Sequence, residues 1–265
     1  MKRSAVYVGN NRILLRTING YKMYVDARDV SIAPHLVLDG AFEEYTDAVL
    51  RSIVKPGMHI LEIGANVGVF TLLMAHRTGV NGSVLSFECD PDLAQIVRDN
   101  LEINGLAHIG TVDERAVSDN AGTLRFFSAV HHRGNGTLVE NLEQVPRMAL
   151  ERKEIEVQST TVDEIVKTSG RAFDLVKIDA EGAESAIFRG GSTLFGDRSR
   201  PLRVIVEFAP AFIKTSGDDP SGYLDRWESS GFTVQRIDER KKKAFPVTRE
   251  TLLGTHISDI LLTRT

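Results

Sequence analysis

The most informative eight residues of the chain read Leu61-Glu62-Ile63-Gly64-Ala65-Asn66-Val67-Gly68. They join an apolar run that is typical of a buried strand to a helical pattern that begins at Val69. Ligands of open α/β sheets bind at such corners, where glycine lets the backbone come close. The third glycine of a dinucleotide fingerprint is missing, so the loop is not specialised for phosphate, and Glu62 suits a cationic group. The residues that we expect to contact the ligand are Glu62, Gly64, Asn66 and Gly68.

A carboxylate completes this signal. Glu88 lies 24 residues after Gly64 and directly follows a second strand-like segment at 83–87. A carboxylate in this place can accept hydrogen bonds from two ribose hydroxyls. The glycine loop and Glu88 together therefore predict a cofactor that carries a nucleoside.

Strand-like and helix-like segments alternate along most of the chain. The strand patterns lie at 58–63, 83–87, 110–117, 175–178 and 204–206, and the helical patterns at 42–54, 69–76, from Pro91 and around 183–187. This alternation predicts a parallel sheet that helices cover on both faces. Segments 232–237 and 257–263 complete seven strands, and we expect one of these two to run antiparallel at the edge. The predicted fold class is α/β, doubly wound and Rossmann-like.

Two regions fall outside this alternation. Asn19-Gly20 lies between short alternating stretches and indicates a hairpin, so we expect a β extension at 1–41 before the main domain at 42–265. The extension could also pair across a homodimer. We expect an insertion that shapes the substrate site at about 120–160, and we interpret His131-His132 in its loop at 128–153 as solvent-exposed rather than as a lid with a histidine base.

Composition excludes several classes of protein. The chain has 265 residues, 42% hydrophobic and 26% charged, as in an ordinary globular protein. Its one cysteine, Cys89, excludes an intramolecular disulfide and a cysteine-based zinc site. A net charge of −4 does not favour a nucleic-acid partner, and Arg240–Lys243 reads as a hairpin loop. The longest apolar stretch, 67–75, is too short for a membrane helix. With no signal peptide in the sequence, we expect a cytoplasmic protein without membrane insertion.

Five segments resemble the FkbM-type methyltransferase family in order and spacing. They lie at 61–70, 86–91, 100–106, 116–119 and 176–184, and the most specific is Lys177-Ile178-Asp179-Ala180-Glu181-Gly182-Ala183-Glu184. The resemblance implies a class I methyltransferase fold, S-adenosylmethionine as methyl donor and O-methylation of a sugar, glycan or natural-product hydroxyl. The family commonly has aspartate where this chain has Glu62, which is a conservative difference.

The expected chemistry lies where the fourth and fifth strands end. Methyl transfer to a hydroxyl is an in-line displacement that needs positioning and a general base or a metal. Asp179 and Glu181 follow the fourth strand and Glu207 ends the fifth. We expect Asp179 to orient the cofactor's methionine end or the acceptor, and Glu181 or Glu207 to act as base. The residues expected near the adenine are Arg115 and Ala116.

Three alternatives remain open from the sequence. Asp179 and Glu207 could hold Mg²⁺, although we favour a site without metal. A nucleic-acid methyltransferase is disfavoured because the chain lacks an Asn/Asp-Pro-Pro-aromatic run. A catalytically inactive binding protein would have no need for the combination of Glu62, Glu88 and Asp179.

Overall fold

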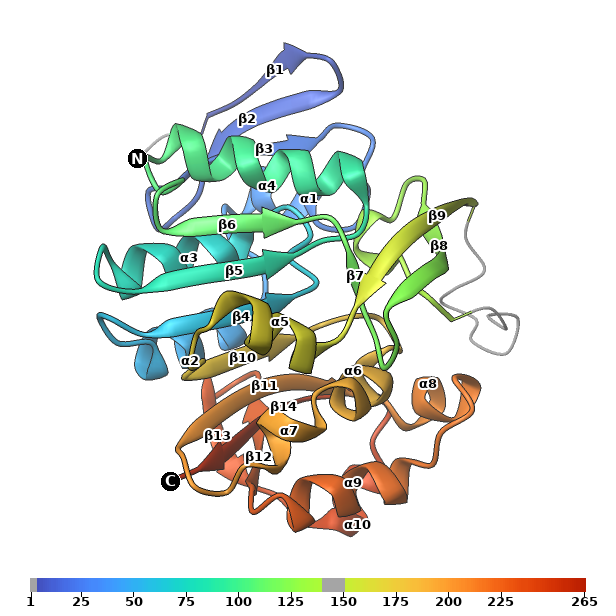
Figure 1. Ribbon diagram of the computed structural model, residues 1–265. Coiled ribbons are helices and arrows are strands. Elements are labelled where there is room, and N and C mark those ends of the chain that lie inside the picture. Colours follow the sequence, from blue (N-terminus) through green and yellow to red (C-terminus); the bar gives the residue numbers. More distant parts are fainter. Residues whose placement is uncertain (1–3, 140–150) are drawn as a thin grey trace.

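The computed structural model describes residues 4–139 and 151–265, so parts of the β extension (1–3) and of the insertion (140–150) lie outside the described residues. Its centre is an eight-stranded sheet in the order β13-β12-β14-β11-β10-β4-β5-β6 (Figure 1). The strands are β4 (His59–Ile63), β5 (Ser83–Phe87), β6 (Gly110–Asp113), β10 (Leu175–Ile178), β11 (Leu202–Phe208), β12 (Thr233–Asp238), β13 (Lys243–Pro246) and β14 (Ser258–Arg264).

Five of these strands are parallel neighbours, from β6 through β5, β4 and β10 to β11. The chain winds outward from β4 to β6 and then returns to lay β10 on the other side of β4. The doubly wound, mostly parallel sheet is therefore confirmed. The point between β4 and β10 where the winding reverses is the place where such sheets bind ligands.

The antiparallel strand differs from the expectation. β14 lies inside the sheet, between β11 and β12, and it is antiparallel to both. The physical reason is its composition. Ile260, Leu261 and Leu262 are consecutive, so they point to both faces of the sheet, and burial of all three requires that both faces are covered. The basic turn at 239–242 forms a hairpin that adds β13 as an eighth strand, paired with β12.

The third predicted strand is also shorter than expected. β6 ends at Asp113, and a turn in which the Arg115 N–H donates to Asp113 Oδ1 at 2.9 Å redirects the chain. Ala116–Val117 then forms β7 in a separate three-stranded sheet, in the order β7-β9-β8. β8 (Gly122–Ala129), the short helix η1 (Arg133–Asn135) and β9 (Arg152–Thr160) are the described parts of the insertion.

The helices cover both faces of the main sheet, in two cores (Figure 1). Neighbouring residues of the inner strands face different cores, as Ile60 and Leu61 of β4 do. The helices are α1 (Ala33–Leu38), α2 (Glu44–Ile53), α3 (Val69–Thr78), α4 (Pro91–Ile103), α5 (Val162–Ser169), α6 (Glu184–Gly190), α7 (Ser192–Gly196), α8 (Pro210–Thr215), α9 (Pro220–Ser229) and α10 (Arg249–Leu253). Among the residues that the structure describes, no helix is long and apolar enough to cross a membrane.

The N-terminal extension packs against the first of these cores. Its antiparallel strands β1 (Ala5–Gly9), β2 (Arg12–Arg16) and β3 (Lys22–Asp26) form a small sheet beside α4 (Figure 1). Buried Asn100 of α4 fixes this contact because its side chain bonds both the N–H and the C=O of Tyr24 and the C=O of Val67. The extension is thereby tied to the glycine loop. A cytoplasmic location and homodimer formation stay predictions.

Candidate active site

A cavity of ≈ 840 Å³ lies at the carboxyl ends of the parallel strands. It brings together eight of the ten residues predicted from the sequence: Gly64, Asn66, Glu88, Arg115, Ala116, Asp179, Glu181 and Glu207. Glu62 and Gly68 are not among its described lining residues. We call the part lined by Gly64, Asn66, Glu88, Arg115 and Ala116 the glycine-loop side, and the part lined by Glu43, Asp179, Glu181, Glu207 and Asp259 the acidic side.

The two glycines of the loop have different tasks. Gly64 has φ +84°, and a Cβ there would lie 1.8 Å from the carbonyl oxygen of Asp179. The loop can therefore meet the end of β10 only with glycine at this position. Gly68 also has φ +84°, but its Cβ would face Val97 Cγ1 of α4 at 3.1 Å. Gly68 thus serves the packing of α3 on α4 rather than the cavity.

Glu62 lies beneath the loop and is fully buried. Its Oε2 accepts hydrogen bonds from Thr71 Oγ1 at 2.5 Å and from Ser86 Oγ at 2.7 Å, and Oε1 has no hydrogen-bond partner in the described part of the chain. Burial raises the pKa of this carboxyl, while nearby Lys177 lowers it. Glu62 therefore holds α3 and β5 together behind the glycine loop.

Glu88 is buried and faces the cavity from the end of β5. Its two oxygens each accept one backbone hydrogen bond, from the Asp90 N–H at 2.9 Å and from the Asn66 N–H at 2.8 Å. A carboxylate has about four acceptor positions, so about two remain for the hydroxyls of a ligand. Burial raises the pKa of Glu88 to about 7, although these two N–H groups lower it.

Arg115 and Ala116 line the cavity at the junction of β6 and β7. The guanidinium of Arg115 forms an ion pair with Asp113 at 2.7 Å and lies 5.9 Å from the centroid of the Phe87 ring. These contacts fix the edge of the cavity beyond Glu88.

Lys177 of β10 and Asp179, which directly follows the strand, form an ion pair on the acidic side. Lys177 Nζ lies 3.0 Å from Asp179 Oδ2, and the lysine side chain is only 3% exposed. Burial lowers the pKa of Lys177, but the carboxylates of Asp179 and Glu62 more than offset this and raise it above its ordinary value. Lys177 therefore stays charged beside Asp179.

Carboxylates crowd the remainder of the acidic side. Glu207 Oε1 is buried and has no hydrogen-bond partner among the described residues. Burial, followed by repulsion from Glu181 and Asp179, raises the pKa of Glu207 well above its ordinary value. Burial also raises the pKa of Glu43 to about 8 and that of Asp259 to about 6, with repulsion from Asp179 as the next cause in both. The side therefore holds protons that an isolated carboxylate would lose.

Sequence reasoning missed Glu43 and Asp259 as site residues. Asp259 lies opposite Glu207 in the β11–β14 pairing, which brings the start of the antiparallel strand to the carboxyl ends of the parallel ones. The apolar residues after Asp259 were a signal for this interior position. Glu43 was expected in the first turn of a helix, but it precedes α2 with φ 43° and faces the cavity.

Glu184 and the two histidines of the insertion are not among the described lining residues of the cavity. Glu184 accepts hydrogen bonds from the N–H groups of Ala180 and Gly182, both at 3.0 Å, so it shapes the loop that carries Glu181. His131 and His132 are not part of the described cavity lining, and the His131 side chain is 52% exposed. The interpretation as solvent-exposed therefore agrees with the structure for His131, whereas His132 is half-buried.

The model of the methyltransferase FkbM domain family matches residues 62–234. The chain belongs to the FkbM methyltransferase family. It thus carries an S-adenosylmethionine-dependent methyltransferase domain with the class I fold that the resemblance implied. The matched segment includes the glycine loop, Glu88, Asp179, Glu181 and Glu207, whereas Glu43 and Asp259 lie outside it.

Individual proteins are similar to parts of this FkbM-family chain. Methyltransferase sdnD of Sordaria araneosa is 24% identical over 214 residues, which cover 72% of this chain and 74% of that protein. The protein-L-isoaspartate O-methyltransferase of Methanococcoides burtonii is 34% identical over 84 residues, and the chain spans only 36% of its length. The solved structure of methyltransferase FkbM from Methylobacillus flagellatus KT is 13% identical, with a TM-score of 0.47 over 78% of this chain and 43% of that chain.

The chemistry of the cavity lining fits S-adenosylmethionine. The loop and Glu88 offer a close backbone approach and acceptors for ribose hydroxyls, and the nearby carboxylates suit a sulfonium and an amino group. Across residues 4–139 and 151–265, no three or more His, Cys, Asp or Glu side chains are grouped so that they could hold a metal ion. Lys177 already neutralises Asp179, which was one of the two carboxylates considered for Mg²⁺.

Proposed function

We propose that this FkbM-family protein is an O-methyltransferase that methylates a hydroxyl of a sugar, glycan or natural product. The observation that supports it is the shared cavity, in which the nucleoside-type contacts of Gly64 and Glu88 adjoin the carboxylates at the ends of β10, β11 and β14. An acceptor on the acidic side would lie next to the methionine end of a cofactor on the glycine-loop side. The similarity to a protein-L-isoaspartate O-methyltransferase, though short, also favours oxygen as the acceptor atom.

The cofactor residues in this proposal are those that line the cavity. Gly64 and Asn66 offer backbone contacts, Glu88 binds the ribose hydroxyls, Arg115 and Ala116 flank the adenine, and Asp179 orients the methionine end. Glu62 and Gly68 support the site from behind, through α3 and α4. Bound S-adenosylmethionine would supply an electrophilic methyl group whose bond to sulfur breaks as the acceptor oxygen attacks.

Glu207 is the proposed general base. Its Oε1 has no hydrogen-bond partner in the described chain, so it can accept a hydrogen bond from a hydroxyl bound on the acidic side. Burial and the neighbouring carboxylates raise the pKa of Glu207, which makes its ionised form a stronger base. It would accept the proton that the acceptor hydroxyl loses. Glu181 remains the other candidate, since it lines the same cavity.

The first test is a thermal-shift titration with S-adenosylhomocysteine, with NAD as control, on the wild type and Glu88→Ala. A ligand at 100 times its Kd adds about 2.7 kcal/mol to the free energy of unfolding, which is readily measured. We expect stabilisation by S-adenosylhomocysteine alone, and its loss in Glu88→Ala. Stabilisation by NAD alone, or an unchanged response in Glu88→Ala, would contradict the proposed binding of S-adenosylmethionine at Glu88.

The second test is methyl transfer with a panel of sugars and natural-product alcohols. With an active acceptor, we expect Glu207→Gln to lower turnover by about 10²-fold or more without changing the affinity for S-adenosylhomocysteine. The same loss in Glu181→Gln, with Glu207→Gln unaffected, would move the role of base to Glu181.

A further inference from the structure

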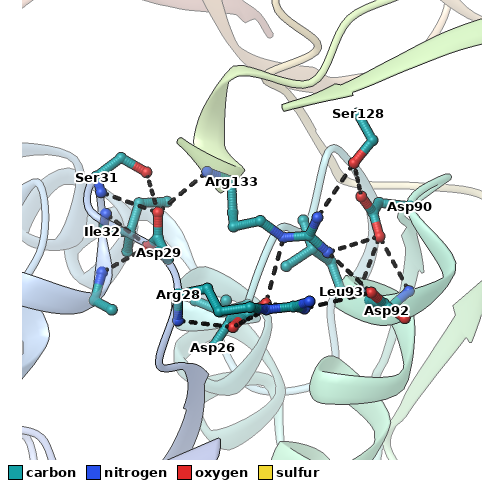
Figure 2. A network of polar contacts seen from close by, with 12 residues as sticks. Asp26, Arg28, Asp29, Ser31, Ile32, Asp90, Asp92, Leu93, Ser128 and Arg133 are labelled. Carbon is teal, nitrogen blue, oxygen red and sulfur yellow. Dashed lines mark hydrogen bonds and ion pairs between the residues drawn. The ribbon is translucent and has the colours of Figure 1, made fainter. Parts of the chain in front are cut away.

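A buried ion network borders the glycine-loop side and centres on Arg133, which also lines the cavity (Figure 2). The guanidinium of Arg133 donates to Asp90 Oδ1 at 3.0 Å and to Ser128 Oγ at 3.2 Å. It also lies 3.6 Å from Asp26 Oδ2 and 3.5 Å from Asp92 Oδ2. One side chain of the insertion thus contacts the N-terminal extension, the start of α4 and β8.

The backbone of Arg133 makes two further contacts. Its N–H donates to Asp29 Oδ1 at 3.1 Å, and its C=O accepts from Asn66 Nδ2 at 3.3 Å. Asp29 in turn accepts from the N–H groups of Ser31 and Ile32, both of which line the cavity (Figure 2). Arg133 therefore reaches the glycine loop by its main chain and α4 by its side chain.

These two routes converge on the Glu88 carboxylate. The Asp90 N–H holds Glu88 Oε1, and Asp90 is the residue that the guanidinium of Arg133 binds. The Asn66 N–H holds Glu88 Oε2, and Asn66 is the residue that the Arg133 carbonyl binds. Both hydrogen-bond donors that orient the carboxylate are thus fixed by the same residue.

We propose that Arg133 is a positioning residue for the cofactor's ribose, acting through Asp90 and Asn66 on Glu88. This inference rests on the proposed function, because it concerns how the same carboxylate is held. It assigns the insertion and the extension a role in cofactor affinity, in addition to any role in recognising the acceptor.

The chain offers a matched control in Arg28, a second arginine of the same network. Arg28 pairs with Asp26 Oδ2 at 2.7 Å and with Asp92 Oδ2 at 3.6 Å, but no contact of Arg28 with Asp90 or Asn66 is observed in the described chain. Its side chain is 43% exposed, against 6% for Arg133. If loss of charge in the network weakens cofactor binding in general, both Arg133→Met and Arg28→Met should weaken it. If Arg133 positions Glu88, only Arg133→Met should.

The experiment measures the Kd of S-adenosylhomocysteine by calorimetry for the wild type, Arg133→Met, Arg133→Lys, Arg28→Met and Glu88→Ala. We expect a Kd raised about tenfold or more in Arg133→Met, about threefold in Arg133→Lys and less than about twofold in Arg28→Met. Lysine keeps the charge but cannot bind Ser128 and Asp90 with a planar fork. Equal losses in Arg133→Met and Arg28→Met, or wild-type affinity in either Arg133 variant, would overturn the proposal.

A double variant separates positioning from general destabilisation. If Arg133 acts through Glu88, Arg133→Met should weaken binding much less in the Glu88→Ala background than in the wild type. Additive losses would overturn the proposal. Removal of one partner of a buried ion pair can unfold a protein, and in that case Arg133→Lys decides by its Kd alone.

The pH profile of the Kd provides a further readout. The charged and titratable groups around Glu88 are Asp90, Cys89 and Arg133, with the Asp113–Arg115 pair beyond them. Because Arg133 favours the ionised carboxylate, Arg133→Met should move the loss of affinity at acid pH to a higher pH, and Arg28→Met should not. An unchanged midpoint in Arg133→Met would contradict the inference. Wild-type binding that Glu88→Ala leaves intact would instead contradict the proposed cofactor site.

Discussion

The two sides of the cavity balance their charges differently. On the glycine-loop side, Glu88 accepts two backbone hydrogen bonds, and Arg133, which also lines the cavity, contacts two buried aspartates. On the acidic side, burial raises the pKa of Glu43, Glu207 and Asp259, and repulsion from Asp179 raises it further in all three. We infer that the first side is organised in advance for a ligand that never varies, whereas the second reaches electrostatic balance only with its ligand in place.

Replacement of Gly64 by alanine should have the largest effect, because it disrupts the glycine-loop side. The new Cβ would overlap the Asp179 carbonyl, so we expect Gly64→Ala to lower the free energy of unfolding by more than about 3 kcal/mol and to abolish binding of S-adenosylhomocysteine. The control is Gly57→Ala: Gly57 has φ +85°, and no described atom would lie within 4 Å of its Cβ. Conformational strain alone should cost about 1–2 kcal/mol there. Urea unfolding of both variants measures the difference, and equal losses would show that the close approach is unimportant.

The pH dependence of the free energy of unfolding tests the charge balance of the acidic side. A carboxyl whose pKa is raised by folding contributes stability that is complete below its ordinary pKa and is lost as the pH rises through the folded value. With pKa values of about 8 for Glu43 and about 6 for Asp259, we expect the ligand-free protein to lose stability steadily between about pH 5 and pH 8.5.

Glu43→Gln should remove part of this loss, because the amide is neutral at every pH. We expect it to be roughly 1–2 kcal/mol more stable than the wild type at pH 8.5, after allowance for solvent screening, and no more stable at pH 5. Glu44→Gln on the neighbouring, 54% exposed position is the control. Urea unfolding at the two pH values measures both, and parallel pH profiles for the wild type and Glu43→Gln would refute the assignment.

Magnesium is expected to have the smallest effect. Since the ammonium of Lys177 already neutralises Asp179, millimolar Mg²⁺ or excess EDTA should change the melting temperature by less than about 1 °C. Calorimetric binding of S-adenosylhomocysteine should be equally insensitive. A clear stabilisation by Mg²⁺ that Asp259→Asn removes would show that the acidic side is a metal site after all.

The sequence predicted what depends on neighbours along the chain. The glycine loop, the helix after it and Glu88 all belong to one strand–helix–strand unit, in which spacing determines geometry. The turn at Asp113 shows the limit of this reasoning. The pattern predicted one strand over 110–117, but the Asp113 side chain accepts a hydrogen bond from the Arg115 N–H and ends the strand there.

Long-range placement was the part that the sequence could not supply. Arg133 bonds Asp90 across 43 residues and Asp29 across 104, and nothing in its own surroundings in the sequence indicates burial. Asp259 was missed because its strand was assigned to the edge, although three buried apolar residues in succession are typical of a strand with both faces covered. Ion pairs between distant segments depend on the order of the strands in the sheet, and the sequence pattern does not specify that order.

The interior position of β14 also sets an order of events during synthesis on the ribosome. The residues of the glycine-loop side, and Arg133 beside them, are all translated before residue 140, whereas the acidic side needs Asp259. Until β14 arrives, the apolar strand β11 emerges with one edge unpaired, which is a surface for chaperones and a risk of aggregation. The segments that carry the nucleoside contacts are therefore made first, but the glycine loop gains its contact with the Asp179 carbonyl only after β10 has been synthesised.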